Sequence, residues 1–243
     1  MGVFKIKAGE FEWIGGAADD PKDLCLHGHV TVRFGDTVLE DHGTVSATAL
    51  YLLKTLTEDK VVAPYDIQMI PCCGHFLIAN KELTEVQISG CDTGTDWSTI
   101  HEGDAIRMIL PSGQEEVVSL REYRCEVLGF AESVKRFYDA CTPKELPKNE
   151  YDRNGYIAFW NEWQRRYHEG LLLLSLEAGR EMELSHEGLH YFISHKDGEW
   201  SLYCEESRKM QLFPDWNALY RTARLGDKLL RAEVCSLTFD TIL

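Results

Sequence analysis

Two short segments of the sequence combine cysteine and histidine in patterns that suit a transition metal. They are Cys25-x-His27-x-His29 and Cys72-Cys73-x-His75. Alternate residues of a strand share one face, so the first three side chains are expected to point the same way. Thiolates and imidazoles are common zinc ligands. A zinc site could therefore begin at Cys25, His27 and His29 and be completed by Cys72, Cys73 and His75.

The spacing of these segments departs from established zinc motifs. Neither segment has the C-x₂-C pair of structural zinc sites, and the chain has no H-E-x-x-H sequence. The competing interpretation, which the sequence favours, is a polar, exposed strand face together with two core cysteines. Cys73 beside His75 also has the residue types of a nucleophile and its base. A buried thiol is the simpler interpretation there.

Other catalytic motifs are incomplete in the sequence. Asp92-Thr93-Gly94 reproduces the tripeptide of aspartic proteases, but those enzymes need two such carboxylates and this chain has one copy. The sequence contains no G-x-S-x-G, Walker A or G-x-G-x-x-G motif. The charged run at Glu181, Glu183, His186 and Glu187 is interpreted as a solvated loop. No complete catalytic constellation emerges from these patterns.

The elements that would position such residues are organised around residues 119–168. Apolar side chains recur there at steps of three and four, which is the spacing of one stripe on an α-helix. Pro143 and Pro147 divide the region, so two central helices are predicted. Ser119 and Glu122 predict a capping box at the start of the first helix. The stripe residues are Leu120, Tyr123, Val127, Phe130, Val134, Phe137 and Cys141, then Tyr156, Phe159, Trp160, Trp163 and Tyr167.

The region before these helices is predicted to consist mainly of strands. Val3–Lys7 and Glu10–Ile14 are expected to form two strands turned at Ala8-Gly9. Period-two alternation from Leu24 to Phe34 predicts a half-buried strand, and Gly35-Asp36 predicts a hairpin turn after it. A helix is expected from Ser46 to about Thr57. Further strands are expected at Asp66–Ile70, His75–Ile78, Glu85–Ser89, Ala105–Leu110 and Glu115–Val118.

The C-terminal third predicts a smaller module. Residues 171–182 fit either a continued helix or a buried strand, and their length favours the helix. Asp197-Gly198 predicts a hairpin between two aromatic-rich strands, and a helix is expected after Pro214. We therefore predict an α+β fold. It comprises a domain of residues 1–170, whose largely antiparallel N-terminal sheet is packed by the central helix pair, and a strand-strand-helix module of residues 171–243.

The excess of acidic over basic residues limits the kinds of molecule that the chain is expected to bind. The chain has 243 residues, 40 acidic against 25 basic, and a net charge of -15. This balance argues against a nucleic-acid or anionic-membrane partner and is compatible with a basic protein partner. No secretory signal or membrane-spanning run is recognised, so a cytoplasmic location with reduced cysteines is expected. The sequence leaves the oligomeric state open.

One pattern covers about residues 185–235. It comprises Leu189–Ile193, Trp200–Tyr203, Phe213 and Gly226-Asp227-Lys228-Leu229. This pattern resembles the strand-strand-helix endings of small bacterial immunity and immunity-like proteins. Those proteins have a gly-lys-x-leu motif, whereas this chain has Asp227 inserted between the glycine and the lysine. The resemblance implies a bacterial protein that occludes a toxin. The rest of the chain resembles only uncharacterised bacterial proteins.

These observations lead to one expected function and two alternatives. We expect a non-enzymatic cytoplasmic protein that binds another protein, with an immunity-type inhibitor of a basic toxin as its specific form. The first alternative is a zinc-binding protein or metal-dependent hydrolase that uses the six cysteine and histidine residues above. The second is a structural or assembly protein with a conventional core.

Overall fold

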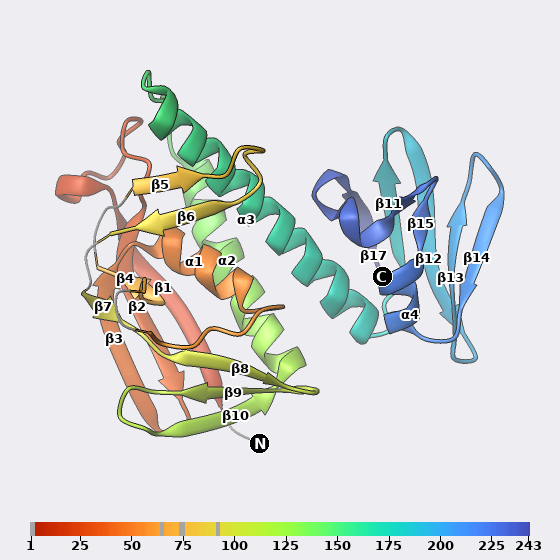
Figure 1. The fold of residues 1–243 in the computed structure, drawn as a ribbon, viewed down its shortest axis with the longest axis horizontal. Helices are drawn as coiled ribbons and strands as arrows, with labels where there is room; N and C mark the ends of the chain where they lie inside the picture. Colours follow the sequence, from red (N-terminus) through yellow and green to blue (C-terminus); the bar gives the residue numbers. More distant parts are fainter. Residues whose placement is uncertain (1–2, 64–65, 73–75, 91–92) are drawn as a thin grey trace. The chain divides into compact units, whose positions relative to one another are not determined.

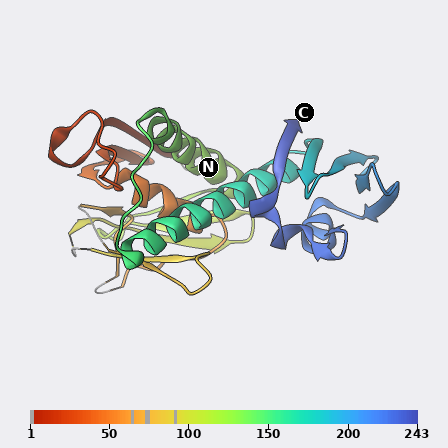
Figure 2. The ribbon, with the colours of Figure 1, turned by 90° about the horizontal axis from the view of Figure 1, so that it is seen from above.

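The computed structural model describes residues 3–63, 66–72, 76–90 and 93–243 (Figures 1 and 2). The chain divides into two compact units, Met1–Arg166 and Tyr167–Leu243. Helices and antiparallel strands build both units, which confirms the predicted α+β fold. Among the described segments, every helix is too short or too polar to traverse a lipid bilayer.

The first unit opens with a three-stranded antiparallel sheet. Its strands, in the order β1-β2-β3, are β1 (Phe4–Glu12), β2 (His27–Phe34) and β3 (Thr37–Gly43). The prediction of two strands turned at Ala8-Gly9 was wrong, because β1 is one strand. Its register against β2 shifts between Gly9 and Glu12, and Glu10 takes a φ of 52°. An irregularity of this kind absorbs extra residues without ending the strand.

Three helices pack in or extend from the first unit. They are α1 (Val45–Lys54), α2 (Leu120–Ala140) and α3 (Glu150–Glu177). Figure 2 shows α2 and the first part of α3 as the long helices of this unit. Ser119 caps α2: its Oγ accepts the N–H of Glu122 at 3.2 Å and donates to the Glu122 carboxylate at 2.7 Å. The predicted helix start is thereby confirmed, and α2 packs against α1 and β1.

Shorter strands complete the first unit. The prediction of a strand at Asp66–Ile70 was wrong, because only Ile70 of this segment belongs to a strand. Side-chain contacts occupy this segment instead: the Asp66 carboxylate accepts the N–H of the neighbouring Ile67, and the more distant Asp96 accepts the N–H of Met69 at 2.9 Å. Such side-chain bonds compete with a strand ladder. The strands are β4 (Ile70–Pro71), β5 (Phe76–Ala79), β6 (Val86–Ser89), β7 (Gly94–Thr95), β8 (Ser98–Glu102), β9 (Ala105–Ile109) and β10 (Glu115–Ser119).

The second unit is built on a five-stranded antiparallel sheet of order β14-β13-β12-β11-β17. The predicted hairpin at Asp197-Gly198 joins β12 to β13, but the module has three more strands in this sheet than were predicted. Residues 171–177 continue α3, and a strand begins only at Met182. The elements are β11 (Met182–His186), β12 (Leu189–Lys196), β13 (Glu199–Cys204), β14 (Lys209–Phe213), α4 (Trp216–Thr222), β15 (Arg224–Leu225), β16 (Lys228–Leu229), η2 (Leu230–Ala232), η3 (Val234–Ser236) and β17 (Thr238–Ile242).

One face of this sheet carries the core of the second unit. Alternate strand residues point to that face and pack with α4 and the last turns of α3. Asp215 caps α4 by accepting the N–H of Ala218 at 2.7 Å. The core includes Leu172, Leu176, Leu184, Tyr191, Ile193, Leu202, Phe213 and Leu219.

Candidate functional site

Of the residues predicted to bind zinc, only two that the structure describes share a strand. His27 and His29 belong to β2, whereas Cys25 precedes the strand. His27 is buried, and its Nε2 lies 3.4 Å from Thr44 Oγ1. Cys72 Sγ lies 2.8 Å from Thr93 Oγ1.

Two members of the predicted set, Cys73 and His75, lie outside the described residues, as does Asp92 of the Asp-Thr-Gly tripeptide. Within the described residues, two groups of three His, Cys, Asp or Glu side chains bring their ligand atoms within 4.8 Å of one another. Neither group contains Cys25, His27, His29 or Cys72. Zinc binding by the six residues stays a prediction.

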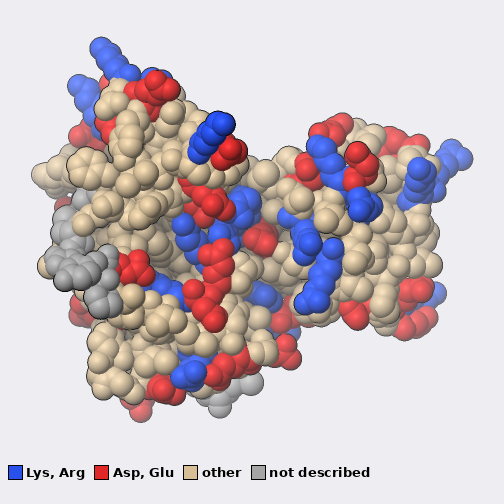
Figure 3. All heavy atoms as spheres, in the orientation of Figure 1, with Lys and Arg blue, Asp and Glu red and all other residues tan. Residues whose placement is uncertain are grey.

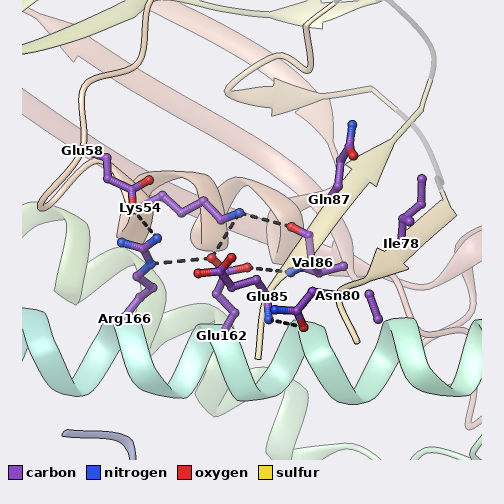
Figure 4. A pocket seen from close by; sticks show the side chains of 10 residues that line it. Lys54, Glu58, Ile78, Asn80, Glu85, Val86, Gln87, Glu162 and Arg166 are labelled. Carbon is purple, nitrogen blue, oxygen red and sulfur yellow. Dashed lines mark hydrogen bonds and ion pairs between the residues drawn. The ribbon is translucent and has the colours of Figure 1, made fainter. Parts of the chain in front are cut away.

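A charged pocket lies in the first unit between α1, the β5–β6 hairpin and α3. Figure 3 shows acidic and basic side chains gathered together there, and Figure 4 shows the pocket from close by. Its volume is about 410 Å³, which lies within the usual range for small-molecule sites. The pocket is lined by Lys54, Glu58, Ile78, Ala79, Asn80, Glu85, Val86, Gln87, Glu162 and Arg166.

Glu162 is the central charge of this pocket, and its side chain is only 1% exposed. One carboxylate oxygen, Oε2, accepts the N–H of Val86 at 2.9 Å. The other, Oε1, lies 3.2 Å from Lys54 Nζ and 3.6 Å from Arg166 Nε. An ionised carboxylate this deeply buried needs such compensation, because removing it from water is costly.

Arg166 extends the network towards solvent. Its side chain is 8% exposed and bonds both the Glu58 carboxylate and the hydroxyl of Thr57. Both oxygens of Glu162 are therefore engaged, and its cationic neighbours have other acceptors as well. In this arrangement Glu162 has no free oxygen to offer a substrate as an acid or base. Its contacts instead hold α1, α3 and β6 to one another.

The charged contacts around Glu162 hold the β5–β6 hairpin in place. Lys54 Nζ donates to the Val86 carbonyl at 3.2 Å, so side chains satisfy both backbone groups of this strand residue. Asn161 Nδ2 donates to the Leu83 carbonyl at 2.8 Å in the hairpin turn. Gly155 of α3 allows close approach, since a Cβ there would lie 2.1 Å from the Leu77 carbonyl oxygen. A two-stranded hairpin is marginally stable alone, so these contacts anchor it.

The second unit offers a different feature, an open apolar sheet face. Phe192 on β12 lies opposite Tyr203 on β13, which lies opposite Met210 on β14. Leu212 is the next residue of β14 on the same face. Met210 is 59% exposed and Leu212 is 57% exposed. We call these four residues the open-face cluster.

The edge beside the open-face cluster is unpaired within the described residues, because β14 pairs with β13 alone. Figure 1 shows β14 as the outermost strand of its sheet. Contiguous exposed apolar side chains typically mark an interaction surface. Aromatic residues and methionine are also enriched at protein interfaces. The cluster therefore has the composition of a protein-binding surface.

Carboxylates border the open-face cluster. Glu183 of β11 lies opposite Phe192, and Glu199 of β13 is on the same face as Tyr203. Asp240 reaches this face as well, since it accepts a hydrogen bond from Ser185. Lys196 of β12 lies opposite Glu199 on this face, so the acidic part of the border is the side of Glu183 and Asp240.

His190 and Glu206 lie at one end of the open face and form an ion pair. His190 Nδ1 lies 2.7 Å from Glu206 Oε1, and the backbone N–H of His190 also bonds this carboxylate. The hydrogen bond to Glu206 raises the pKa of His190 above its ordinary 6.5. The same contact lowers the pKa of Glu206 to about 2.

We expect NMR titration to find the pKa of His190 above 6.5. Because its folded-state pKa is raised, its contribution to stability is present below pH 6.5 and is lost as the pH rises through the folded pKa. For Glu206 the contribution is present above pH 4.5 and is lost as the pH falls towards 2. Glu206→Gln should return the pKa of His190 towards 6.5, and an unchanged pKa in that variant would contradict the assignment.

The sequence patterns did not predict the central residue of the charged pocket or the outer strand of the open-face cluster. Glu162 falls beside the aromatic stripe of its helix and carries no motif. Met210 and Leu212 alternate in sequence, a signal that could have predicted β14. The interpretation of residues 181–187 as a solvated loop was wrong, because Glu183 and His186 belong to β11 and His186 is 3% exposed.

No family model matches this chain, and the searches of curated proteins and of solved structures give no match. No residue role is therefore transferred from a relative.

Proposed function

We propose that the chain is a non-enzymatic protein-binding protein whose partner docks on the open-face cluster. The supporting observation is that the exposed Met210 and Leu212 adjoin the half-buried Phe192 and Tyr203 on one sheet face, at an edge that no other described strand pairs with. Full burial of one such side chain contributes about 1.5–3 kcal/mol. A partner that covers the cluster would thus gain most of its affinity from a few contacts.

The partner is a basic protein. The acidic border of the cluster and the net charge of -15 favour a surface rich in lysine and arginine. Exposed charges of this kind mainly raise the association rate, and salt screens their effect. Binding is therefore expected to weaken with ionic strength through slower association, while the apolar contacts govern dissociation.

The specific form of this proposal is a cytoplasmic, immunity-type inhibitor that occludes a basic toxin. The resemblance of residues 185–235 to immunity-like proteins supports it. The open-face cluster falls within that stretch, so the resemblance and the candidate surface coincide. A basic toxin would also be the class of partner that an acidic border attracts.

The open-face cluster is tested by partner capture followed by reconstitution. Tagged protein is expressed in the source organism, and the captured protein is identified, purified and titrated by calorimetry. We expect a basic partner whose Kd rises by about 30-fold or more in the Met210→Glu/Leu212→Glu variant, as for loss of an interface hot spot.

Val38→Glu is the matched control for this experiment. Val38 is a 50% exposed strand valine in the first unit, remote from the cluster by sequence and sheet. The control should keep the affinity of the unchanged protein. An acidic partner, or a basic partner that binds the Met210/Leu212 variant with unchanged Kd, would contradict the proposal.

A further inference from the structure

A second cluster of the second unit combines one imidazole and two carboxylates. His186 ends β11, Glu187 follows it in a tight turn, and Glu233 lies between η2 and η3. Their ligand atoms all lie within 4.8 Å of one another. His186 is 3% exposed and points to the same side of β11 as the core residue Leu184. This cluster is on the opposite face of the sheet from the open-face cluster.

The cluster already surrounds a positive charge. Lys228 Nζ lies 2.9 Å from Glu187 Oε1 and 3.3 Å from Glu233 Oε2. His186 Nε2 lies 3.0 Å from the same Glu233 oxygen. With a neutral imidazole, two carboxylates and one ammonium leave a net charge of -1. A divalent cation in place of the ammonium would balance the two carboxylates completely.

We propose that His186, Glu187 and Glu233 form a divalent transition-metal site, which zinc fills by displacing the Lys228 ammonium. One imidazole nitrogen and two carboxylate oxygens are a donor set that zinc accepts, with water at the fourth position. The Lys228 side chain is 42% exposed, so it can turn into solvent when it is displaced. The exchange involves no covalent or redox step. If His186 is protonated beforehand, binding releases that proton.

Two of the three ligands are held by the fold before a metal arrives. His186 is fixed by its place at the end of a paired, buried strand. Glu233 is held between two short helices whose neighbours Leu230 and Val234 are buried, and Ser236 Oγ donates to Glu233 Oε2 at 3.4 Å. Glu187 is 64% exposed and completes the set from the turn.

The other donor group, His190 with Glu205 and Glu206, is a weaker candidate. The His190 side chain is 56% exposed. Both Glu206 oxygens already accept the backbone N–H of His190, and one also contacts its ring. This group therefore serves as the matched control for the His186 group.

The site is tested with the whole 243-residue chain, stripped of metal, and with Zn²⁺ and Co²⁺ as the probes. Calorimetry measures zinc affinity, and the Co²⁺ spectrum identifies the donor atoms. We expect one site with d–d bands but no thiolate charge-transfer band, which separates it from a cysteine site. Glu187→Gln alters an exposed side chain, so it keeps the fold, and it should weaken zinc binding by at least about tenfold, as loss of an outer-shell partner alone does.

Three further variants complete the zinc test. Lys228→Met removes the competing charge and should tighten zinc binding by about tenfold. His186→Gln should abolish the site, with circular dichroism confirming that the variant is folded. His190→Gln should bind zinc as the unchanged protein does. The proposal is overturned if neither the unchanged protein nor Lys228→Met binds zinc, if binding survives His186→Gln, or if the Co²⁺ spectrum shows thiolate ligands.

Discussion

Replacing Glu162 by alanine is expected to destabilise the first unit by about 3–5 kcal/mol, the usual effect of removing one partner of a buried ion pair. The variant leaves the Lys54 ammonium and the Arg166 guanidinium without their central carboxylate, and the N–H of Val86 without its acceptor. Urea unfolding measures the loss of free energy. Hydrogen exchange should show the largest loss of protection at the amides of β6, since Glu162 bonds that strand directly.

Glu85→Ala is the matched control for the Glu162 variant. Glu85 lines the same pocket, but its side chain is 60% exposed and lies 3.4 Å from Arg165. A surface ion pair of this kind contributes about 1 kcal/mol or less. If both substitutions lowered the free energy of unfolding by a similar amount, the burial of Glu162 would not explain its contribution to stability.

Gly155→Ala is expected to destabilise the first unit by about 1–3 kcal/mol, as overpacking does. The new Cβ would lie 2.1 Å from the Leu77 carbonyl oxygen and 2.7 Å from Leu77 Cβ, so β5 must move away from α3. Thermal or urea unfolding measures this effect. Increased hydrogen exchange across β5 and β6 would show that the hairpin has loosened.

Gly129→Ala provides a control of opposite sign. Gly129 lies within α2, and a Cβ at this position would meet no atom within 4 Å outside its own helix. The same substitution should therefore stabilise the protein by about 0.5–1 kcal/mol, the ordinary advantage of alanine over glycine in a helix. Stabilisation by Gly155→Ala as well would contradict the close packing of α3 on β5.

Local patterns predicted the elements whose residues interact with near neighbours in sequence. The capping box of Ser119 and Glu122 and the hairpin turn at Asp197-Gly198 both depend on residues three or fewer positions apart. The predicted alternation held from His27 to Phe34, where one face of β2 is buried throughout, but residues 24–26 lie outside the strand. Where local side-chain bonds competed with strand pairing, as at Asp66, propensity and alternation gave the wrong element.

The candidate sites depend on contacts that no local pattern contains. Glu162 bonds Val86, 76 positions away in sequence. The open-face cluster is contiguous only because the registers of β12, β13 and β14 bring Phe192, Tyr203 and Met210 side by side. A one-residue slip in any of these registers would turn the cluster towards the core. The sequence predicted protein binding from charge and resemblance, but it could not indicate which surface would bind.

The place of β17 in the second sheet has a consequence for biosynthesis. This strand pairs with β11, although more than 50 residues separate them in the chain. A ribosome therefore releases β11 well before its neighbour exists, and one edge of β11 stays unpaired during that interval. Unpaired edges invite association with other nascent chains. Glu183, the second residue of β11, places a charge on that temporary edge and opposes such association until Thr238–Ile242 emerge.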